Sequence, residues 1–415
     1  MNRQVAGVRG VAALLPDAAA AWTRVEERAR AWLWAYGFQE IRLPVLERTE
    51  LYARAVGEVT DIVEKEMYTF LDRNGDSLSL RPEGTAGCVR AGIEAGLFHH
   101  QTQRLWYLGP MFRHERPQKG RYRQFHQLGV EAYGMAGPDI EAELVALGER
   151  LLGAFGVKAR LLINSLGTPE CRSRYRAALV AYLEGHAAAL DEDSRRRMAR
   201  NPLRVLDSKN PEMAEVLASA PRIADFWNED ARAHFDGFSE RLRALGVRYE
   251  VAPRLVRGLD YYSHTVFEWV AEDLGAQATV CAGGRYDGLV GELGGAPTPA
   301  AGFALGLERL MALARDLPAG RALDVFVMTP AALNARALTL AESLRDAGLG
   351  VEVHLGGASP KSQMKRAQQS GARCLARIEE TGVVLRGPGD SESHVAWSDA
   401  AERITTSLGA RNETS

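Results

Sequence analysis

The feature that most constrains the fold is a pair of strand-like segments around a strongly basic loop. Residues 104–113 and 124–133 are rich in aromatic and other large apolar side chains, which favour extended structure. The eleven residues 113–123 contain five cations against the single acid Glu115: Arg113, Arg116, Lys119, Arg121 and Arg123. Such a cluster can neutralise phosphates, although a solvated hairpin tip has the same composition. A hairpin with a basic tip is therefore predicted.

The composition indicates a globular chain of two or three domains. The chain has 415 residues, 46% of them hydrophobic and 25% charged, which are ordinary values. It has no run of 18 apolar residues and no secretion-type apolar segment at its start, so we expect neither a membrane partner nor secretion. The net charge of −2 means that a polyanionic partner must meet a local basic patch.

Cysteine spacing argues against disulfides and against a cysteine-bound metal. The four cysteines are far apart in the chain: Cys88, Cys171, Cys281 and Cys374. They form neither a disulfide framework nor a CxxC pair. A reducing, cytoplasmic location fits them best.

Hydrophobic periodicity predicts a mixed α/β (α+β) architecture. Helical patterns occur at 17–36, 86–95, 139–155 and 303–314, and further strand patterns at 38–45, 78–80, 248–252, 259–270 and 276–290. A stretch rich in Ala, Arg and Glu, from about 170 to 245, has helical spacing and predicts a helical insertion. A linker at 316–321 then precedes alternating strand and helix patterns, which predict a small α/β domain at 322–415.

The second hairpin strand carries a candidate floor for a small ligand. Gln127, Gly129 and Glu131 share one face because side chains alternate along a strand. Gly129 has no side chain and is predicted to leave room between the amide and the carboxylate. A buried Glu131 needs a cationic partner, which a bound ammonium or imidazolium would supply. A phosphate-binding arginine is expected above this floor, at the strand end.

Three further segments contain glycine and polar residues but are ambiguous when taken singly. Residues 257–262 open a strand with Gly258 and two tyrosines, residues 281–289 form a glycine-rich turn, and residues 302–309 combine two glycines with Arg309. The last two glycines would leave room for a flat ring, on which Arg309 could stack. A strand start, a tight turn and ordinary packing explain them equally well. Because the sequence has no metal-ligand spacing and no glycine-rich phosphate loop, a nucleotide would be held by arginines and a sheet.

Taken together, these segments resemble the histidyl-tRNA synthetases of the bacterial type, which are class II aminoacyl-tRNA synthetases. The three class II motifs correspond to residues 37–48, 104–133 and 302–310, and two signatures particular to the histidine enzymes correspond to 257–262 and 283–289. The resemblance covers nearly all of residues 1–318 and, more weakly, the C-terminal domain.

This resemblance implies a domain plan. Residues 1–318 would form the catalytic domain, an antiparallel sheet flanked by helices, with the helical insertion at about 170–245. Residues 322–415 would form an anticodon-binding-type α/β domain. The family also implies a homodimer that associates through the catalytic domain.

The resemblance further implies a ligation in two steps. Histidine and ATP give histidyl-adenylate, and the acyl group then passes to the 3′ end of histidine tRNA. Arg113 and Arg257 would stabilise the charge that develops when the carboxylate attacks the α-phosphate. Arg309 would hold the other end of ATP, and Mg²⁺ would bridge its β- and γ-phosphates.

The resemblance also assigns binding residues. Those expected at the α-amino group of histidine are Glu83, Thr85 and Gln127, and those expected at the imidazole are Glu131 and Tyr262, with Tyr261 and Tyr286 nearby. A buried polar pair around the ring rejects analogues that leave it unpaired. Arg116 and Gln118 match the positions that read the extra 5′ guanosine of histidine tRNA.

Two departures from the family pattern keep other functions open. Ala13 stands where the family usually has Asp, and residues 376–382 are several positions short of the usual strand and acidic turn, so we expect a partly eroded C-terminal domain. Residues 322–415 contain ten Lys and Arg against eleven Asp and Glu, with no basic excess that would indicate RNA binding. One alternative is a paralogue that activates histidine for a non-tRNA acceptor. Another is a non-catalytic, synthetase-like regulator of histidine biosynthesis.

Overall fold

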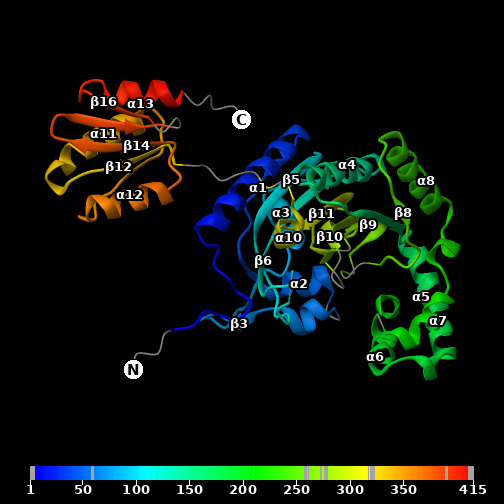
Figure 1. Ribbon diagram of the computed structural model, residues 1–415. Coiled ribbons are helices and arrows are strands. Elements are labelled where there is room, and N and C mark those ends of the chain that lie inside the picture. Colours follow the sequence, from blue (N-terminus) through cyan, green and yellow to red (C-terminus); the bar gives the residue numbers. More distant parts are fainter. Residues whose placement is uncertain are drawn as a thin grey trace. The chain divides into compact units, whose positions relative to one another are not determined.

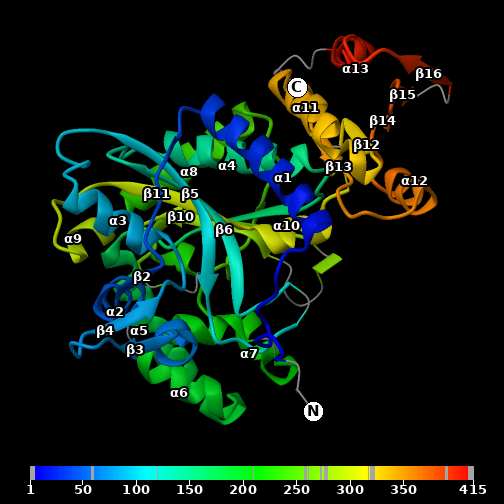
Figure 2. The same cartoon turned by 90° about the vertical axis from the view of Figure 1, so that its left-hand side faces the viewer.

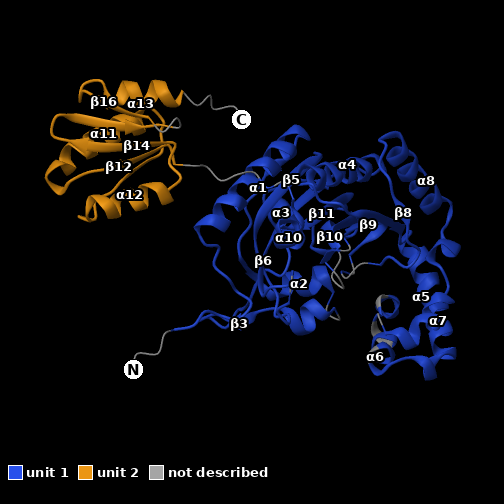
Figure 3. Ribbon diagram, viewed as in Figure 1, with its two compact units in different colours: residues 1–318 blue, residues 319–415 orange. Residues whose placement is uncertain are grey.

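The computed structural model contains two compact units, residues 1–318 and 319–415 (Figure 3). It describes residues 5–57, 60–118, 120–208, 210–256, 259, 261–271, 273–274, 279–315, 317, 323–387 and 391–409, without the side chains of Asp193, Ala199, Arg200 and Asp207. None of the helices within these ranges is both long enough and apolar enough to cross a membrane.

An eight-stranded sheet organises the first unit (Figures 1 and 2). In spatial order its strands are β1 (Gln39–Glu40), β5 (Gln103–Phe112), β6 (Gln124–Tyr133), β11 (Ala300–Gly306), β10 (Thr279–Arg285), β9 (Ser263–Val270), β7 (Arg160–Ser165) and β8 (Glu250–Val251). All neighbours between β5 and β7 in this spatial order are antiparallel. Of the two edge strands, β1 pairs in parallel with β5, and β8 pairs in parallel with β7. The predicted antiparallel sheet flanked by helices is confirmed.

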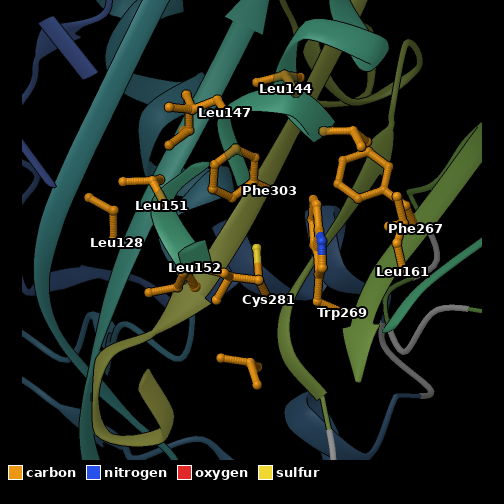
Figure 4. Close-up of a cluster of buried hydrophobic side chains, with 14 of the residues drawn as sticks. Leu128, Leu144, Leu147, Leu151, Leu152, Leu161, Phe267, Trp269, Cys281 and Phe303 are labelled. Atoms are coloured by element: carbon orange, nitrogen blue, oxygen red, sulfur yellow. The ribbon is translucent and has the colours of Figure 1, made fainter. Parts of the chain in front are cut away.

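One face of this sheet is covered by helices that bury an apolar core. The helices are α1 (Pro16–Ala35), α4 (Asp139–Ala154), α8 (Glu229–Ala244) and α10 (Leu307–Leu313). Figure 4 shows leucines of α4 against Phe303 and Trp269 of the sheet. A Cβ on Gly148 would lie 2.5 Å from the Trp269 ring, so glycine lets α4 approach the sheet closely. Leu128 and Val130 of β6 point into this core, which directs Gln127 and Glu131 to the opposite face.

The opposite face carries a second core that is rich in tyrosine. Its surrounding elements are α2 (Thr49–Val56), α3 (Thr85–Glu94), α9 (Leu289–Glu292), the π-helix η1 (Ile62–Glu66) and a small sheet of β2 (Leu46–Arg48), β4 (Ser77–Leu80) and β3 (Thr69–Leu71). Tyr107, Tyr133 and Tyr286 are buried here. Their hydroxyls bring polar groups into an apolar layer, where each needs a hydrogen-bond partner or carries a desolvation cost.

The region from about 170 to 245 is helical, as its composition indicates. It contains α5 (Pro169–Gly185), α6 (Glu192–Arg200), α7 (Ala214–Ala218), α8 and short 3₁₀ segments at Ala187–Ala189, Pro202–Asp207, Pro211–Met213 and Ile223–Phe226. Side chains of Thr168, Asp191 and Asn228 accept hydrogen bonds from backbone amides at the starts of α5, α6 and α8. These caps satisfy amides that have no partner within the helix.

Two of the predicted elements are wrong. Residues 38–45 do not form one strand, because β1 ends at Glu40 and the next strand begins at Leu46, beyond Pro44, which has no amide to donate. Residues 303–314 are not one helix, since Ala300–Gly306 is a central strand paired on both sides and the helix begins only at Leu307. The predicted strand at 259–270 is also shorter and begins at Ser263.

The second unit has a five-stranded sheet of its own. In spatial order its strands are β13 (Val351–Val353), β12 (Val325–Met328), β14 (Cys374–Glu379), β15 (Gly382–Arg386) and β16 (Glu392–Val395), packed with α11 (Asn334–Asp346), α12 (Pro360–Gln369) and α13 (Ala400–Leu408). At the segment expected to be short, Glu379 pairs directly with Gly382, so two residues connect the strands. Two-residue connections are the commonest in hairpins, and the sheet is unbroken at this point.

Candidate active site

A cavity of about 230 Å³ lies over β6, β10 and β11 of the first unit. Nine of the residues predicted from the sequence line it: Glu83, Thr85, Arg113, Gln127, Glu131, Tyr261, Tyr262, Tyr286 and Arg309. These residues come from segments that are far apart in the chain, and the order of the strands in the sheet brings them together. The cavity has an acidic end around Glu131 and a cationic end around Arg309.

The acidic end is built around the buried carboxyl group of Glu131, which is 1% exposed. Its Oε1 accepts hydrogen bonds from Thr85 Oγ1 at 2.8 Å and from the Tyr107 hydroxyl at 3.0 Å, and its Oε2 accepts one from the Tyr286 hydroxyl. Burial raises the pKa of Glu131 to about 8, despite these donors. Among the described residues, the hydrogen-bond partners of Glu131 are hydroxyls and none is a cation, so a bound ligand could supply the expected cationic partner.

Two of the three glycines that were predicted to leave space for a ligand are instead filled by protein side chains. A Cβ on Gly129 would lie 2.0 Å from the ring of Tyr107, which fills the gap expected between Gln127 and Glu131. A Cβ on Gly302 would lie 1.9 Å from Oε2 of Glu131. These glycines make room for protein side chains, whereas the position of a Cβ on Gly306 meets only Arg309 and a carbonyl oxygen, at 3.8 Å or more.

A second buried carboxyl group, Glu83, lies at the start of α3. It accepts hydrogen bonds from the backbone amides of Thr85 and Ala86, at 2.7 and 2.9 Å, as a carboxylate at a helix N-terminus does. Burial nevertheless raises the pKa of Glu83. Oε1 of Gln127 is buried without a hydrogen-bond partner among the described residues. This end of the cavity therefore offers hydrogen-bond acceptors to a ligand.

The cationic end is formed by arginines that donate to backbone carbonyls. Nε of Arg113 donates to the Pro82 oxygen at 2.8 Å, and its guanidinium lies 5.2 Å from the centre of the Phe125 ring. Arg309 donates to the oxygens of Gly120, at 3.2 Å, and Thr279, at 2.6 Å. Within the described ranges, neither arginine forms an ion pair. Burial, and then the positive charges of Arg121 and Arg113, lower the pKa of Arg309. Cations gathered in this way favour a bound anion.

Three tyrosines connect the two ends. The rings of Tyr261 and Tyr262 are 4.7 Å apart, and that of Tyr286 is 5.5 Å from Tyr261 and 6.3 Å from Tyr262, measured between centroids. All three are buried and line the cavity. They form an aromatic wall beside Glu131.

Two of the predicted residues lie outside the cavity wall, and a third is not described. Arg116 and Gln118 are exposed on the basic loop, outside the cavity wall. Arg257 lies outside the described residues, as does Lys119 of the loop.

Sequence reasoning missed Tyr107 and Glu308, and it did not place Glu115 and Arg121 of the basic loop in the cavity wall. Tyr107 supports Glu131, Glu115 and Arg121 form an ion pair of 2.9 Å in the cavity wall, and Glu308 follows β11. Both oxygens of Glu308 accept from the His126 amide, at 2.9 Å, and Oε1 also lies 3.0 Å from His126 Nδ1. Glu308 thereby fixes the start of α10, and with it Arg309, to β6. The signal for Tyr107 was the strand register, which pairs it with Gly129.

No group of three or more His, Cys, Asp or Glu side chains suited to a metal ion occurs within the described ranges.

The fold and the cavity have the arrangement that the class II resemblance implies: an antiparallel sheet, a hairpin with a basic tip, and an arginine at the start of the helix after β11. The family model described as histidyl-tRNA synthetase matches residues 10–310. A histidine–tRNA ligase of Dechloromonas aromatica (strain RCB) is 54% identical, over 98% of this chain and 98% of that protein. The chain therefore belongs to the histidyl-tRNA synthetase family.

Solved structures agree with this membership. The chain is similar to apo histidyl-tRNA synthetase of S. aureus, with 33% identity, a TM-score of 0.81, and coverage of 97% of this chain and 100% of that one. A Bacillus halodurans protein described as an ATP phosphoribosyltransferase regulatory subunit/histidyl-tRNA synthetase is 23% identical, with a TM-score of 0.65 and coverage of 88% and 97%. The second likeness concerns the fold alone.

Proposed function

We propose that this protein is a histidine–tRNA ligase, which activates L-histidine with ATP and transfers it to the 3′ end of histidine tRNA. The observation that carries the proposal is the polarity of one cavity. Two buried carboxyl groups and an amide oxygen lie at one end. At the other lie Arg113 and Arg309, which form no ion pair within the described ranges. A cationic amino acid and a polyanionic nucleotide fit these ends and would meet between them.

Histidine is the amino acid that we assign to the acidic end. Glu83, Thr85 and Gln127 would receive its ammonium group, for which Gln127 Oε1 already offers an unpaired acceptor. Glu131 would accept one N–H of the imidazole, and Tyr262 would contact the other nitrogen. Tyr261 and Tyr286 would enclose the ring. An apolar side chain of similar size would leave Glu131 buried and unpaired, which costs binding free energy.

ATP is the ligand that we assign to the cationic end. Attack of the histidine carboxylate on the α-phosphate brings two anions together, so fixed positive charge at that point lowers the barrier. Arg113 would supply this charge, together with Arg257 by family resemblance, and Arg309 would hold the far phosphates. Mg²⁺ would enter as part of the ATP substrate and bridge its β- and γ-phosphates.

The acceptor would be histidine tRNA. Arg116 and Gln118 are exposed on the basic loop, where they can reach a ligand outside the cavity. We assign the recognition of the extra 5′ guanosine to these two residues. We assign catalysis to the domain of residues 1–318 and anticodon-stem binding to the domain of residues 322–415. We further propose a cytoplasmic homodimer, as the family implies.

Two other functions make different predictions. A regulator of histidine biosynthesis has no use for the arginines at the cationic end, and Arg113 and Arg309 both line the cavity. A paralogue with a small acceptor has no use for a tRNA-binding domain, and the second unit has an unbroken sheet with its own core. Both observations favour the ligase.

Charging of purified histidine tRNA with labelled histidine tests the proposal. We expect ATP-dependent charging that falls steeply with salt, because phosphate contacts dominate tRNA affinity. Histidine-dependent adenylate formation without charging at any salt concentration would favour the paralogue. Absence of both would favour the regulator.

A further inference from the structure

Tyr107 lies behind the acidic end of the cavity and does not line it. Its side chain, on β5, is only 2% exposed, and its hydroxyl donates to Oε1 of Glu131 at 3.0 Å. It therefore contacts the carboxyl group from the side away from a ligand.

The backbone around the Tyr107 ring is built to hold it. A Cβ on Gly129 would lie 2.0 Å from this ring, and a Cβ on Gly84 would lie 2.2 Å from it. Real Cβ atoms do not approach this closely, so both positions require glycine as long as the ring is in place. The ring fills a slot between two segments, and its hydroxyl can reach only a narrow range of positions.

A count of acceptor positions shows what the hydroxyl does for Glu131. A carboxylate oxygen accepts about two hydrogen bonds. Oε1 already accepts from Tyr107 and from Thr85 Oγ1, at 2.8 Å, so its positions are occupied. Within the described ranges Oε2 accepts only from Tyr286, so one of its two positions is open. Only Oε2 can thus take a hydrogen bond from a ligand.

We propose that Tyr107 is a positioning residue, which holds Oε1 of Glu131 so that Oε2 alone accepts one ring N–H of the amino-acid substrate. The identity of that substrate rests on the proposed function. With one open acceptor position, the carboxyl group can accept a hydrogen bond from only one ring N–H. The other ring nitrogen then needs a different partner.

The test is Tyr107→Phe, which removes the hydroxyl and keeps the ring in its slot. We expect the KM for histidine in pyrophosphate exchange to rise about tenfold or more, as for a lost hydrogen bond to a charged group, and the KM for ATP to stay within about twofold. Tyr52→Phe is the matched control. Tyr52 is a fully buried tyrosine outside the cavity wall, and its hydroxyl has no hydrogen-bond partner within the described ranges.

A measurement without ligand separates this proposal from the proposed function. The Tyr107 hydroxyl favours the ionised form of Glu131, so its removal raises the pKa of that carboxyl further. The other titratable groups around Glu131 are Glu83, Cys88, Tyr133, Tyr261 and Tyr286, which the substitution leaves in place. Ionisation of Glu131 lowers the free energy of unfolding of the ligand-free protein. This decrease should continue beyond pH 8 in Tyr107→Phe and should end near pH 8 in Tyr52→Phe.

The outcomes are distinct. A raised KM for histidine alone, together with the shifted pH profile, supports the role of Tyr107. If both tyrosine variants behave alike in KM and in pH profile, Tyr107 only fills space and the proposal is overturned. If the wild-type protein shows no histidine-dependent exchange, the proposed function fails, and the pH profile still decides whether Tyr107 positions Glu131.

Discussion

The two ends of the cavity solve opposite electrostatic problems in different ways. At the acidic end, Glu131 is buried and bonded to neutral hydroxyls, so ionisation is costly until a cation arrives. At the cationic end, Arg113 and Arg309 donate to backbone carbonyls and form no ion pair within the described ranges. Among the described residues, then, no ion pair neutralises Glu131, Arg113 or Arg309. Each end keeps its charge, or its capacity for charge, available to a ligand.

The surroundings of the two ends differ as well. Glu131 has donors from three separate elements and is tightly enclosed by glycine positions. Arg309 is held by Gly120 of the basic loop and by Thr279, the first residue of β10. A fixed acidic end suits recognition of one small ring. A cationic end held partly by a loop suits a larger substrate whose phosphates change charge during the reaction.

The largest effect is expected when the cationic end is broken. Arg309→Ala should lower the rate of histidine-dependent pyrophosphate exchange by about 10²-fold or more, the scale of losing one preorganised electrostatic group. Histidine binding, measured by calorimetry without ATP, should change little. Arg315→Ala is a suitable control, because Arg315 is exposed and pairs with Asp273 at 3.7 Å. If Arg309→Ala exchanges pyrophosphate at the wild-type rate, Arg309 has no role in adenylate formation.

Breaking the acidic end should produce the complementary pattern. Glu131→Gln keeps the size of the side chain and removes its charge, so the KM for histidine should rise by roughly 10–100-fold, as for the loss of a hydrogen bond to a charged group. The KM for ATP should be nearly unchanged. Steady-state exchange kinetics with each substrate varied in turn give both values. Equal changes in the two constants would mean that Glu131 supports the sheet and not the ligand.

A smaller effect is expected outside both ends. Arg116→Ala should reduce charging of normal histidine tRNA by about tenfold, within the range of 1–3 kcal/mol for one base contact. Charging of a tRNA that lacks the extra guanosine should fall much less, and pyrophosphate exchange should be unaffected. If both tRNAs lose activity equally, Arg116 contacts phosphate and reads no base.

A separate effect, on stability in the absence of ligand, tests the acidic end alone. Glu131 has a pKa of about 8 in the folded protein and an ordinary value of 4.5. The folded state thus holds the proton more tightly, and the contribution of this group is present below pH 4.5 and is lost as pH rises toward 8. The loss is at most about 1.4 kcal/mol per pH unit for one proton. In chemical denaturation of the ligand-free protein, Glu131→Gln should therefore become more stable relative to wild type as pH rises over this range. Parallel pH profiles of the two proteins would contradict the raised pKa of this buried carboxyl group.

Most of the sheet could be predicted from local patterns, but the exact junctions could not. Strands 104–113 and 124–133 were predictable because apolar and aromatic residues fill both segments. The helix predicted at 303–314 failed because apolar residues at 303, 307 and 310 also fit a central strand followed by a helix. Periodicity over a few residues cannot separate the two, since pairing on both sides of β11 is a tertiary effect.

Site residues that belong to a recognisable motif could be predicted from the sequence. Residues whose role depends on the pairing register between strands could not. Gln127 and Glu131 follow from side-chain alternation and family resemblance, and both line the cavity. Tyr107 was missed because its role depends on the cross-strand pairing with Gly129. The same cause explains the wrong reading of Gly129 and Gly302 as space for a ligand, because a sequence does not show which side chain fills the gap above a glycine.

The most direct test of the central claim is exchange of pyrophosphate into ATP with histidine or with β-(2-thienyl)alanine, whose five-membered ring has no N–H. We expect exchange with histidine and a loss on the order of 10⁴-fold in kcat/KM with the thienyl analogue, because Glu131 would be left buried without a ligand N–H to accept. Comparable kcat/KM values for the two amino acids would contradict the account, since the acidic end would then read only the size of the ring.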